Sequence, residues 1–298
     1  DIDPAMLAKV YESPEVTGTI TAEAAALTGL KEGTIVVGGA GDNAAAAVGT
    51  GVVEDGRAFA TIGTSGVVFA HTDKLSIDPK GRVHTFCCAV PGAWHVMGVT
   101  LAAGQSLKWY RDNFCDADKV EAEKQGVDPY DLMTAEAAKT PIGSNRLIYL
   151  PYLMGERTPH LDPDCRGAFV GLSGMHTRYD LVRAVMEGVT FSLRDCAEIL
   201  RGMGVQSDVI LACGGGGSSA FWRQMMADIL GCPVATTISK ECPALGVAIL
   251  AGVGAGLYPS VPEACRQIIG VNASQAPVAE HVAEYDKFYE IYRGLYPA

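Results

Sequence analysis

The chain has 298 residues, 48% of them hydrophobic, and its 23 Lys and Arg residues against 34 Asp and Glu give a formal charge of −11. This length is enough for one large or two ordinary domains, each with a sizeable core. The acidic balance argues against nucleic acid as a partner, because nucleic-acid-binding surfaces are basic. The sequence shows no signal peptide and no 20-residue apolar run, so we expect a cytoplasmic protein without membrane association.

The nine cysteines are odd in number and form no CxxC pair and no cluster with histidine at zinc spacing. This pattern predicts unpaired, buried thiols in a reducing compartment rather than disulfides or a metal site.

Strand-like and helix-like segments alternate along the chain. We expect a buried strand over 34–42, a helix over 43–53, and two strands flanking a GTSG turn within 57–72. Further strands are expected over 83–90, 94–100, 146–153, 207–215 and 233–238, and further helices over 101–114, 179–204, 219–231, 243–257 and 282–296. This order predicts an α/β or α+β layered protein.

The first glycine-rich stretch, GGAGDN (38–43), places a carboxylate directly after a strand and at the start of a helix. Its small neighbours leave room for a substrate beside Asp42. The alternative is that Asp42 only caps the helix that follows.

The second stretch is the GTSG turn (63–66), which presents consecutive backbone N–H groups and two hydroxyls at a hairpin tip. Such a tip can hold phosphate oxygens. It can equally be no more than a turn.

The third stretch begins CGGGGSSAFW at residue 213, where a strand meets four glycines and a helix that Ser218 or Ser219 can cap. Bare backbone lets a nucleotide lie close, although a tight strand-to-helix turn explains the glycines as well. A Rossmann site is disfavoured, because Ser219 takes the third glycine position and no acidic residue follows the next strand. The chain has no Gly-Lys dipeptide, which excludes a P-loop, and it lacks the protein-kinase HRD and DFG signatures.

Taken together, the three stretches resemble the FGGY family of carbohydrate kinases, and most closely its xylulose-phosphorylating members. GGAGDNAAAAVGTGVV, ATIGTSGVVF, LPYLMGERTPHLDPDCRGAFVGL, VRAVMEGVTFSLRD and ECPALGVAILAG are similar to successive family blocks, in the family's order. The resemblance covers nearly all of the chain after about Pro14.

The resemblance implies an actin-like ATPase (ribonuclease H-like) fold, with a mixed sheet flanked by helices. Residues 1–52 are expected to be the terminal part of the N-terminal kinase domain, with the catalytic Asp, and 53–298 the C-terminal nucleotide-binding domain. No DxGT hairpin opens the chain. We therefore expect a fragment that is inactive alone, and whose exposed former interface favours a homodimer.

The implied reaction is ATP-dependent phosphorylation of a ketopentose, D-xylulose to D-xylulose 5-phosphate. Asp42 would be the general base and, with Asn43, would contact the sugar; the turn would hold the β- and γ-phosphates. The ATP-binding set implied by the resemblance is Gly63, Thr64, Ser65, Gly66, Gly104, Gly214, Gly215, Gly216, Gly217 and Ser219, with Lys108 a weaker candidate. Mg²⁺ would bridge the phosphates mostly through water, and no protein ligand for it is assigned.

Two alternatives stay open. The chain can be a non-catalytic actin-like nucleotide-binding module, or belong to a kinase for another sugar or polyol of the same family. The GERTPH loop (155–160) can either face the cleft or form a salt-bridged loop between two domains.

Overall fold

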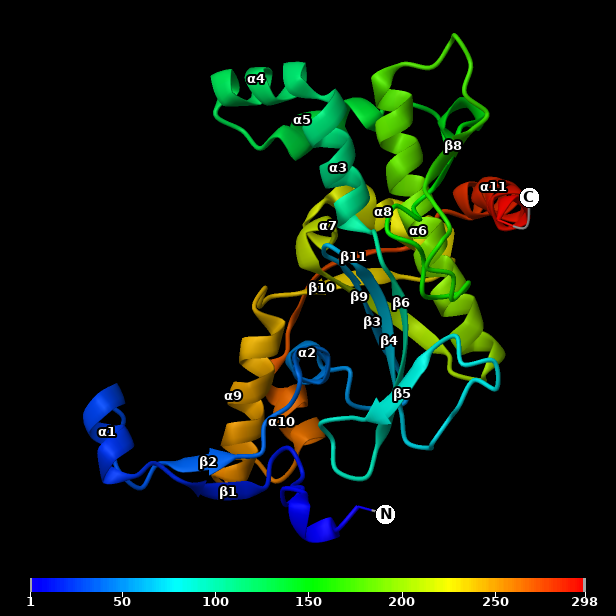
Figure 1. The fold of residues 1–298 in the computed structure, drawn as a ribbon. Helices are drawn as coiled ribbons and strands as arrows, with labels where there is room; N and C mark the ends of the chain where they lie inside the picture. The colour runs from blue at the N-terminus through cyan, green and yellow to red at the C-terminus, as the bar shows by residue number, and fades with distance from the viewer. Residues whose placement is uncertain (1, 297–298) are drawn as a thin grey trace.

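The computed structural model describes residues 2–296, and its centre is a seven-stranded mixed sheet in the order β11-β10-β9-β3-β4-β6-β5 (Figure 1). The strand β9 runs parallel to β3 and β10, and the other pairs are antiparallel. The seven strands are β3 (Gly56–Ile62), β4 (Gly66–Thr72), β5 (His84–Cys87), β6 (Trp94–Thr100), β9 (Ser207–Cys213), β10 (Val234–Thr237) and β11 (Val271–Gln275).

Helices cover both faces of this sheet, so the predicted α/β architecture is confirmed. They are α1 (Ala22–Thr28), α2 (Asp42–Thr50), α3 (Gly104–Phe114), α4 (Asp116–Gln125), α5 (Pro129–Ala137), α6 (Arg178–Gly202), α7 (Gly214–Ser218), α8 (Ala220–Leu230), α9 (Cys242–Gly254), α10 (Val261–Ile268) and α11 (Ala279–Leu295). Two 3₁₀ turns, η1 (Pro4–Met6) and η2 (Ser144–Arg146), and two small two-stranded sheets complete the elements of the described residues. The sheets pair β1 (Val16–Thr19) with β2 (Ile35–Val37) and β7 (Ile148–Leu150) with β8 (Ala168–Val170).

The predicted hairpin around GTSG lies at the middle of the sheet. Ala58 pairs with Ala70 and Ile62 with Gly66, which leaves only residues 63–65 as the tip. Strand side chains alternate between the two faces. Ala60 and Ile62 therefore pack in the core under α6, whereas Phe59 packs on the other side against α2. Figure 1 shows α2, α9 and α10 gathered on one side of the sheet and the long α6 on the other.

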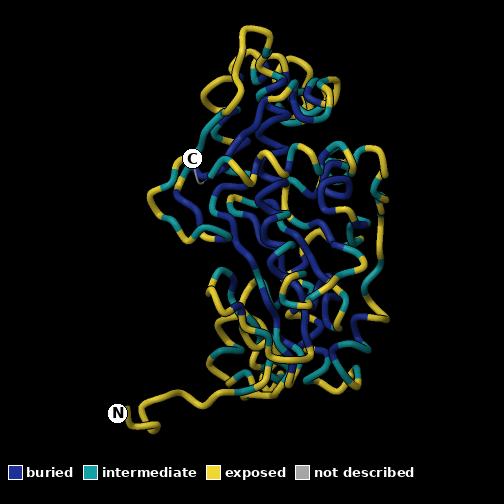
Figure 2. The backbone as a smooth tube through the Cα atoms, turned by 90° about the vertical axis from the view of Figure 1, so that its right-hand side faces the viewer, coloured by how far each residue is buried: buried dark blue, intermediate teal, exposed yellow. Residues whose placement is uncertain are grey.

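The strand expected over 34–42 forms, but the prediction that it is buried is wrong. It is only three residues long, pairs with β1 alone and lies outside the central sheet. Helix α9 contacts this two-stranded sheet at Val37, but Val36, on the opposite face, stays 40% exposed. Figure 2 shows the same contrast, with buried backbone through the middle of the molecule and an exposed N-terminal end.

We expected the four glycines to form a loop before the helix. They form the short helix α7 instead. Ser219 then separates α7 from α8, and its hydroxyl accepts a hydrogen bond from the N–H of Trp222 at 3.3 Å. The predicted serine N-cap is therefore confirmed at Ser219.

The prediction that the cysteines are buried is wrong for Cys87, whose side chain is exposed on β5, near the edge of the sheet. Cys165 and Cys213 are half-buried, and the other six are buried. None of the helices in the described part of the chain combines the length and apolar character that crossing a bilayer requires.

Candidate functional site

A cavity of about 560 Å³ opens where the tip of the β3–β4 hairpin meets the starts of α3 and α8. Segments that are far apart in the sequence meet around it: the hairpin tip, α3, α5, and the glycine helix α7 with the first turn of α8. The residues that line it are Ile62, Gly63, Thr64, Gly104, Gln105, Leu107, Lys108, Asp128, Tyr130, Asp131, Thr134, Gly215, Gly216, Ser218, Ser219 and Trp222.

The hairpin tip is held in place by backbone hydrogen bonds from the start of α3. The N–H of Gly104 donates to the carbonyl of Gly63 at 2.7 Å, and the N–H of Ala103 donates to the carbonyl of Thr64 at 3.0 Å. This close approach requires glycine, because a Cβ at position 104 would lie 2.4 Å from the Gly63 oxygen. The tip is therefore fixed by its carbonyl groups.

The amides at the tip remain available. Within residues 2–296, neither the N–H of Thr64 nor that of Ser65 has a hydrogen-bond acceptor. Adjacent unpaired N–H groups in a rigid turn attract anionic oxygens such as those of phosphate. The geometry at the tip therefore suits a phosphate group.

The four glycines 214–217 lack side chains mainly because this segment packs closely against the β3–β4 hairpin. A Cβ at Gly216 would lie 2.6 Å from the side chain of Ile62, and one at Gly214 would lie 2.7 Å from the Ile62 carbonyl oxygen. Gly214 also has φ +75°, which disfavours other residues. Only at Gly215 does the missing side chain leave space with no atom within 4 Å, and Gly215 lines the cavity.

Two aromatic side chains, Trp222 and Tyr130, contribute to the remaining wall, which also carries charged and polar groups. Trp222 is 3% exposed, and its indole N–H donates to the hydroxyl of Thr190 on α6 at 3.0 Å. Tyr130 contributes from α5, with the Arg111 guanidinium 4.6 Å from its ring centroid. Aromatic rings near a tip with free N–H groups suit a ligand with a flat apolar part and an anionic part.

The structure brings together six of the ten residues predicted to bind ATP: Gly63, Thr64, Gly104, Gly215, Gly216 and Ser219. Lys108, the weaker candidate, also lines the cavity, and its ammonium group bonds the Asp112 carboxylate at 2.8 Å.

Four predicted residues, Ser65, Gly66, Gly214 and Gly217, do not line the cavity. Gly66 belongs to β4, and Gly217 packs against Ala212, so both act in packing. Sequence reasoning missed the contribution of α5, because no element was predicted between 115 and 145. The Asp128–Pro129 pair, an N-cap followed by proline at the first helical position, was the available signal.

Asp42 and Asn43 lie outside this cavity, at the start of α2. Asp42 is exposed, and its Oδ1 accepts only from the N–H and side-chain amide of Asn43, at 2.8 and 3.4 Å. The N-cap position is occupied by Gly41, so Asp42 does not cap the helix with its side chain. Its carboxylate is therefore free to meet a solvent-borne hydroxyl group.

The helix that carries Asp42 is fixed tightly to the rest of the chain. Gly49 of α2 faces the carbonyl of Cys242 in α9, and Gly246 of α9 faces the carbonyl of Ala45. Ala46 and Ala47 pack on Phe59 of the central hairpin. Asp42 thus has a rigid support that is connected, through β3, to the hairpin tip.

Within the described residues, Glu156 of the GERTPH loop is held by hydrogen bonds rather than by a salt bridge. Glu156 is buried and accepts hydrogen bonds from the Thr100 hydroxyl and from the N–H of Leu101 at 2.9 Å. Burial raises the pKa of its carboxyl group to about 7. Glu156 thereby holds the turn between β6 and α3, the segment that positions the hairpin tip.

Comparison with known sequences identifies the class of protein. The C-terminal domain model of the FGGY family of carbohydrate kinases matches residues 58–255, and the N-terminal domain model matches residues 1–49. The chain therefore belongs to the FGGY family of carbohydrate kinases.

Several of the curated relatives are xylulose kinases. The chain is 38% identical to the xylulose kinase of Bacillus subtilis over 287 residues, which cover 96% of this chain and 56% of that protein. It is 36% identical to the xylulose kinase of Escherichia coli K12, covering 99% of this chain and 59% of that protein. The chain thus spans little more than half the length of the curated relatives it matches.

Solved structures of sugar kinases share the fold of this chain. A ligand-bound xylulose kinase from Lactobacillus acidophilus superimposes with a TM-score of 0.89 at 29% identity, over 99% of this chain and 58% of that one. The xylulose kinase from Rhodospirillum rubrum gives a TM-score of 0.85 at 31% identity, over 99% of this chain and 58% of that one. The fold is that of an actin-like ATPase, as the sequence predicted.

Proposed function

We propose that this chain takes part in the ATP-dependent phosphorylation of D-xylulose to D-xylulose 5-phosphate. The observation that carries the proposal is the cavity that joins the hairpin tip, Gly104 and the glycine helix, three features that come from separate parts of the sequence. The xylulose kinases among its relatives support the choice of sugar.

The residues around the cavity fit a nucleoside triphosphate. The N–H group of Thr64, which lines the cavity, and that of its neighbour Ser65 at the rim would hold phosphate oxygens. The open backbone at Gly215 and the aromatic ring of Trp222 would receive the base and ribose. Bound ATP supplies the phosphoryl group, with Mg²⁺ neutralising its charge. Residues 2–296 contain no cluster of three or more metal-ligating side chains, so we propose that Mg²⁺ is held by the phosphates and water.

We assign Asp42 the role of general base toward the primary hydroxyl at C5 of the ketose, with Asn43 as a second sugar contact. Its exposed carboxylate can accept the hydroxyl proton as that oxygen attacks phosphorus. General-base assistance of this kind contributes about 10²–10⁴-fold to the rate. The hairpin tip would meanwhile hold the phosphate chain rigid, so that positioning supplies much of the remaining acceleration.

Because the chain spans 56–59% of the relatives' length, we propose two separable activities. The chain itself binds nucleotide, and turnover requires the region that the relatives carry in addition. The domain boundary near residue 52 remains part of this proposal.

A second candidate substrate is a sugar acid. The gluconokinase of Bacillus subtilis is 34% identical to the chain over 296 residues. Phosphorylation of gluconate by the completed enzyme, with no response to D-xylulose, would select this alternative.

The first experiment measures ATP and ADP binding to the chain by the fluorescence of Trp222, which lines the cavity. Saturable quenching that disappears in the Trp222→Phe variant is the expected result.

The second experiment adds the N-terminal half of the Bacillus subtilis xylulose kinase and measures sugar-dependent ADP release. Turnover that falls about 10²-fold or more in Asp42→Asn, but not in the exposed control Asp208→Asn, supports the assignment. Absence of nucleotide binding overturns it.

A further inference from the structure

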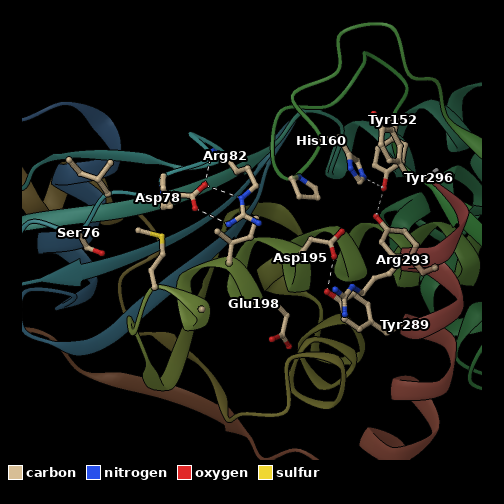
Figure 3. A pocket seen from close by; sticks show the side chains of 17 residues that line it. Ser76, Asp78, Arg82, Tyr152, His160, Asp195, Glu198, Tyr289, Arg293 and Tyr296 are labelled. Atoms are coloured by element: carbon tan, nitrogen blue, oxygen red, sulfur yellow. Dashed lines mark hydrogen bonds and ion pairs between the residues drawn. The ribbon is translucent and has the colours of Figure 1, made fainter.

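A second cavity, of about 610 Å³, shares no lining residue with the first. It lies between the C-terminal halves of α6 and α11, the loop before β5, and the loop between β7 and β8 (Figure 3). The proposed kinase reaction uses none of its residues.

A buried carboxylate, that of Asp195 on α6, is directed into this cavity. The residue is 7% exposed, and its Oδ1 accepts a hydrogen bond from the Tyr289 hydroxyl at 2.7 Å. No described residue donates to Oδ2. Burial raises the pKa of Asp195 to about 7. The free oxygen of Asp195 is therefore a hydrogen-bond acceptor that the protein itself leaves unused.

One wall of the cavity consists of neutral groups that can donate or accept. The Tyr152 hydroxyl bonds the Nε2 of His160 at 2.9 Å and the Tyr292 hydroxyl at 3.0 Å. His160 stacks on the ring of Tyr296 at 3.5 Å between centroids, and burial lowers its pKa to about 4, so the imidazole is neutral. Figure 3 shows this group on one side of the cavity and Asp195 with Tyr289 below it.

Charges of both signs surround the opening. Arg82 is paired with the Asp78 carboxylate at 2.8 Å, and Arg293 extends from α11 close to Asp195. Glu198 lies three residues beyond Asp195 on α6 and accepts from Arg201 at 3.0 Å. An anion would meet Asp195 and Glu198, and a cation would meet the two arginines. Neither sign of charge is favoured by such a lining.

We propose that this cavity binds a neutral polyhydroxylated molecule, a free monosaccharide or polyol, with the unused oxygen of Asp195 as its principal acceptor. Hydroxyl groups both donate and accept, so they match carboxylate, guanidinium and tyrosine hydroxyl groups at once. The tyrosine and proline surfaces supply the apolar contacts that the C–H faces of a sugar need. This second site is independent of the proposed kinase reaction.

The test titrates the whole chain, labelled with ¹³C at its methionine methyl groups and ¹⁵N at its tryptophans, with D-xylose, D-glucose and xylitol. Met203 lines the second cavity, and the indole N–H of Trp222 lies beside the first. A Met203→Leu variant assigns the methyl signal. Saturable movement of the Met203 signal, with the Trp222 signal unchanged, is the expected result.

Two variants test the residues. Asp195→Asn keeps the shape but removes the charge that the carboxylate carries above its pKa of about 7. Measured at about pH 8.5, this variant should weaken binding by about tenfold or more, since hydrogen bonds to charged groups are the stronger kind. Arg293→Gln changes an exposed side chain at the opening and should weaken binding even if Asp195→Asn fails to fold. The exposed control Asp208→Asn should bind as the parent chain does.

Three results would overturn the proposal. The first is no movement of Met203 with any of the three compounds up to about 100 mM, a range that includes even weak binding. The second is a response of Met203 to inorganic phosphate or putrescine but not to the sugars, which would indicate an ionic ligand. The third is a sugar response at Trp222 alone, which would place the sugar at the proposed kinase site.

Discussion

The contact between α2 and α9 gives the sharpest prediction, because two glycines replace side chains at a backbone-to-backbone crossing. A Cβ on Gly49 would lie 1.8 Å from the carbonyl oxygen of Cys242, whereas ordinary van der Waals contact begins at 3.4 Å. The obstacle is main chain and cannot turn aside as a side chain would. Gly49→Ala must therefore push the two helices apart.

The cost follows from two opposing effects. Overpacking a close contact costs about 1–3 kcal/mol, and a clash with backbone belongs at the upper end of that range. Alanine is favoured over glycine in a helix by about 1 kcal/mol. The free energy of unfolding of Gly49→Ala should therefore fall by about 2 kcal/mol.

The assay is urea denaturation followed by far-UV circular dichroism. The matched control is Gly294→Ala in α11, where the added Cβ would meet no atom within 4 Å, so that variant should be as stable as the parent or slightly more so. Equal midpoints for the two variants would refute the close packing of α2 on α9, and with it the rigid support proposed for Asp42.

Three further predictions concern other parts of the molecule. Burial raises the pKa of Glu156 from 4.5 to about 7, so the titration of Glu156 alone should lower the free energy of unfolding by about 3 kcal/mol as pH rises from about 4.5 to 7. Because Asp195 titrates in the same window, Glu156→Gln should remove about half of the total fall seen in denaturations at a series of pH values. An unchanged pH profile would contradict this. Gly104→Ala should weaken ADP binding about tenfold or more, measured by calorimetry. The added Cβ would lie 2.4 Å from the carbonyl oxygen of Gly63 and would push the hairpin tip away. Unchanged affinity would count against a nucleotide at the hairpin tip. A thiol reagent should modify Cys87 first, since it is the exposed cysteine of the described chain; Cys87→Ser should abolish the fast phase seen by absorbance, and persistence of that phase would show that another thiol is reached.

The central hairpin and the glycine run were predictable because each has a local signal. GTSG between two β-rich runs specifies a tip at Gly63 and its neighbours, and Ser219 specifies a cap. The function of the individual glycines was less predictable. Gly214 and Gly216 are bare because of Ile62, a partner more than 150 positions earlier in the chain, which no local pattern reveals.

The exposure of β2 and the contribution of α5 could not be predicted, because both depend on how elements pack in three dimensions. The apolar run at 35–37 has the composition of an interior strand, but burial depends on which layers cover it, and only β1 pairs with it. Tyr130 reaches the cavity because α5 folds back beside α3, a tertiary arrangement. The second cavity escaped prediction for the same reason, since Asp195 and Tyr289 are 94 residues apart.

One helix, α6, connects features that have been treated separately. Thr190 receives the indole hydrogen bond of Trp222 at the first cavity, and Asp195, five residues later, enters the second. At 1.5 Å per residue, these two points are about 7.5 Å apart along the helix axis. A substitution that displaced α6 along its axis would therefore disturb the support of Trp222 and the wall that carries Asp195 at the same time.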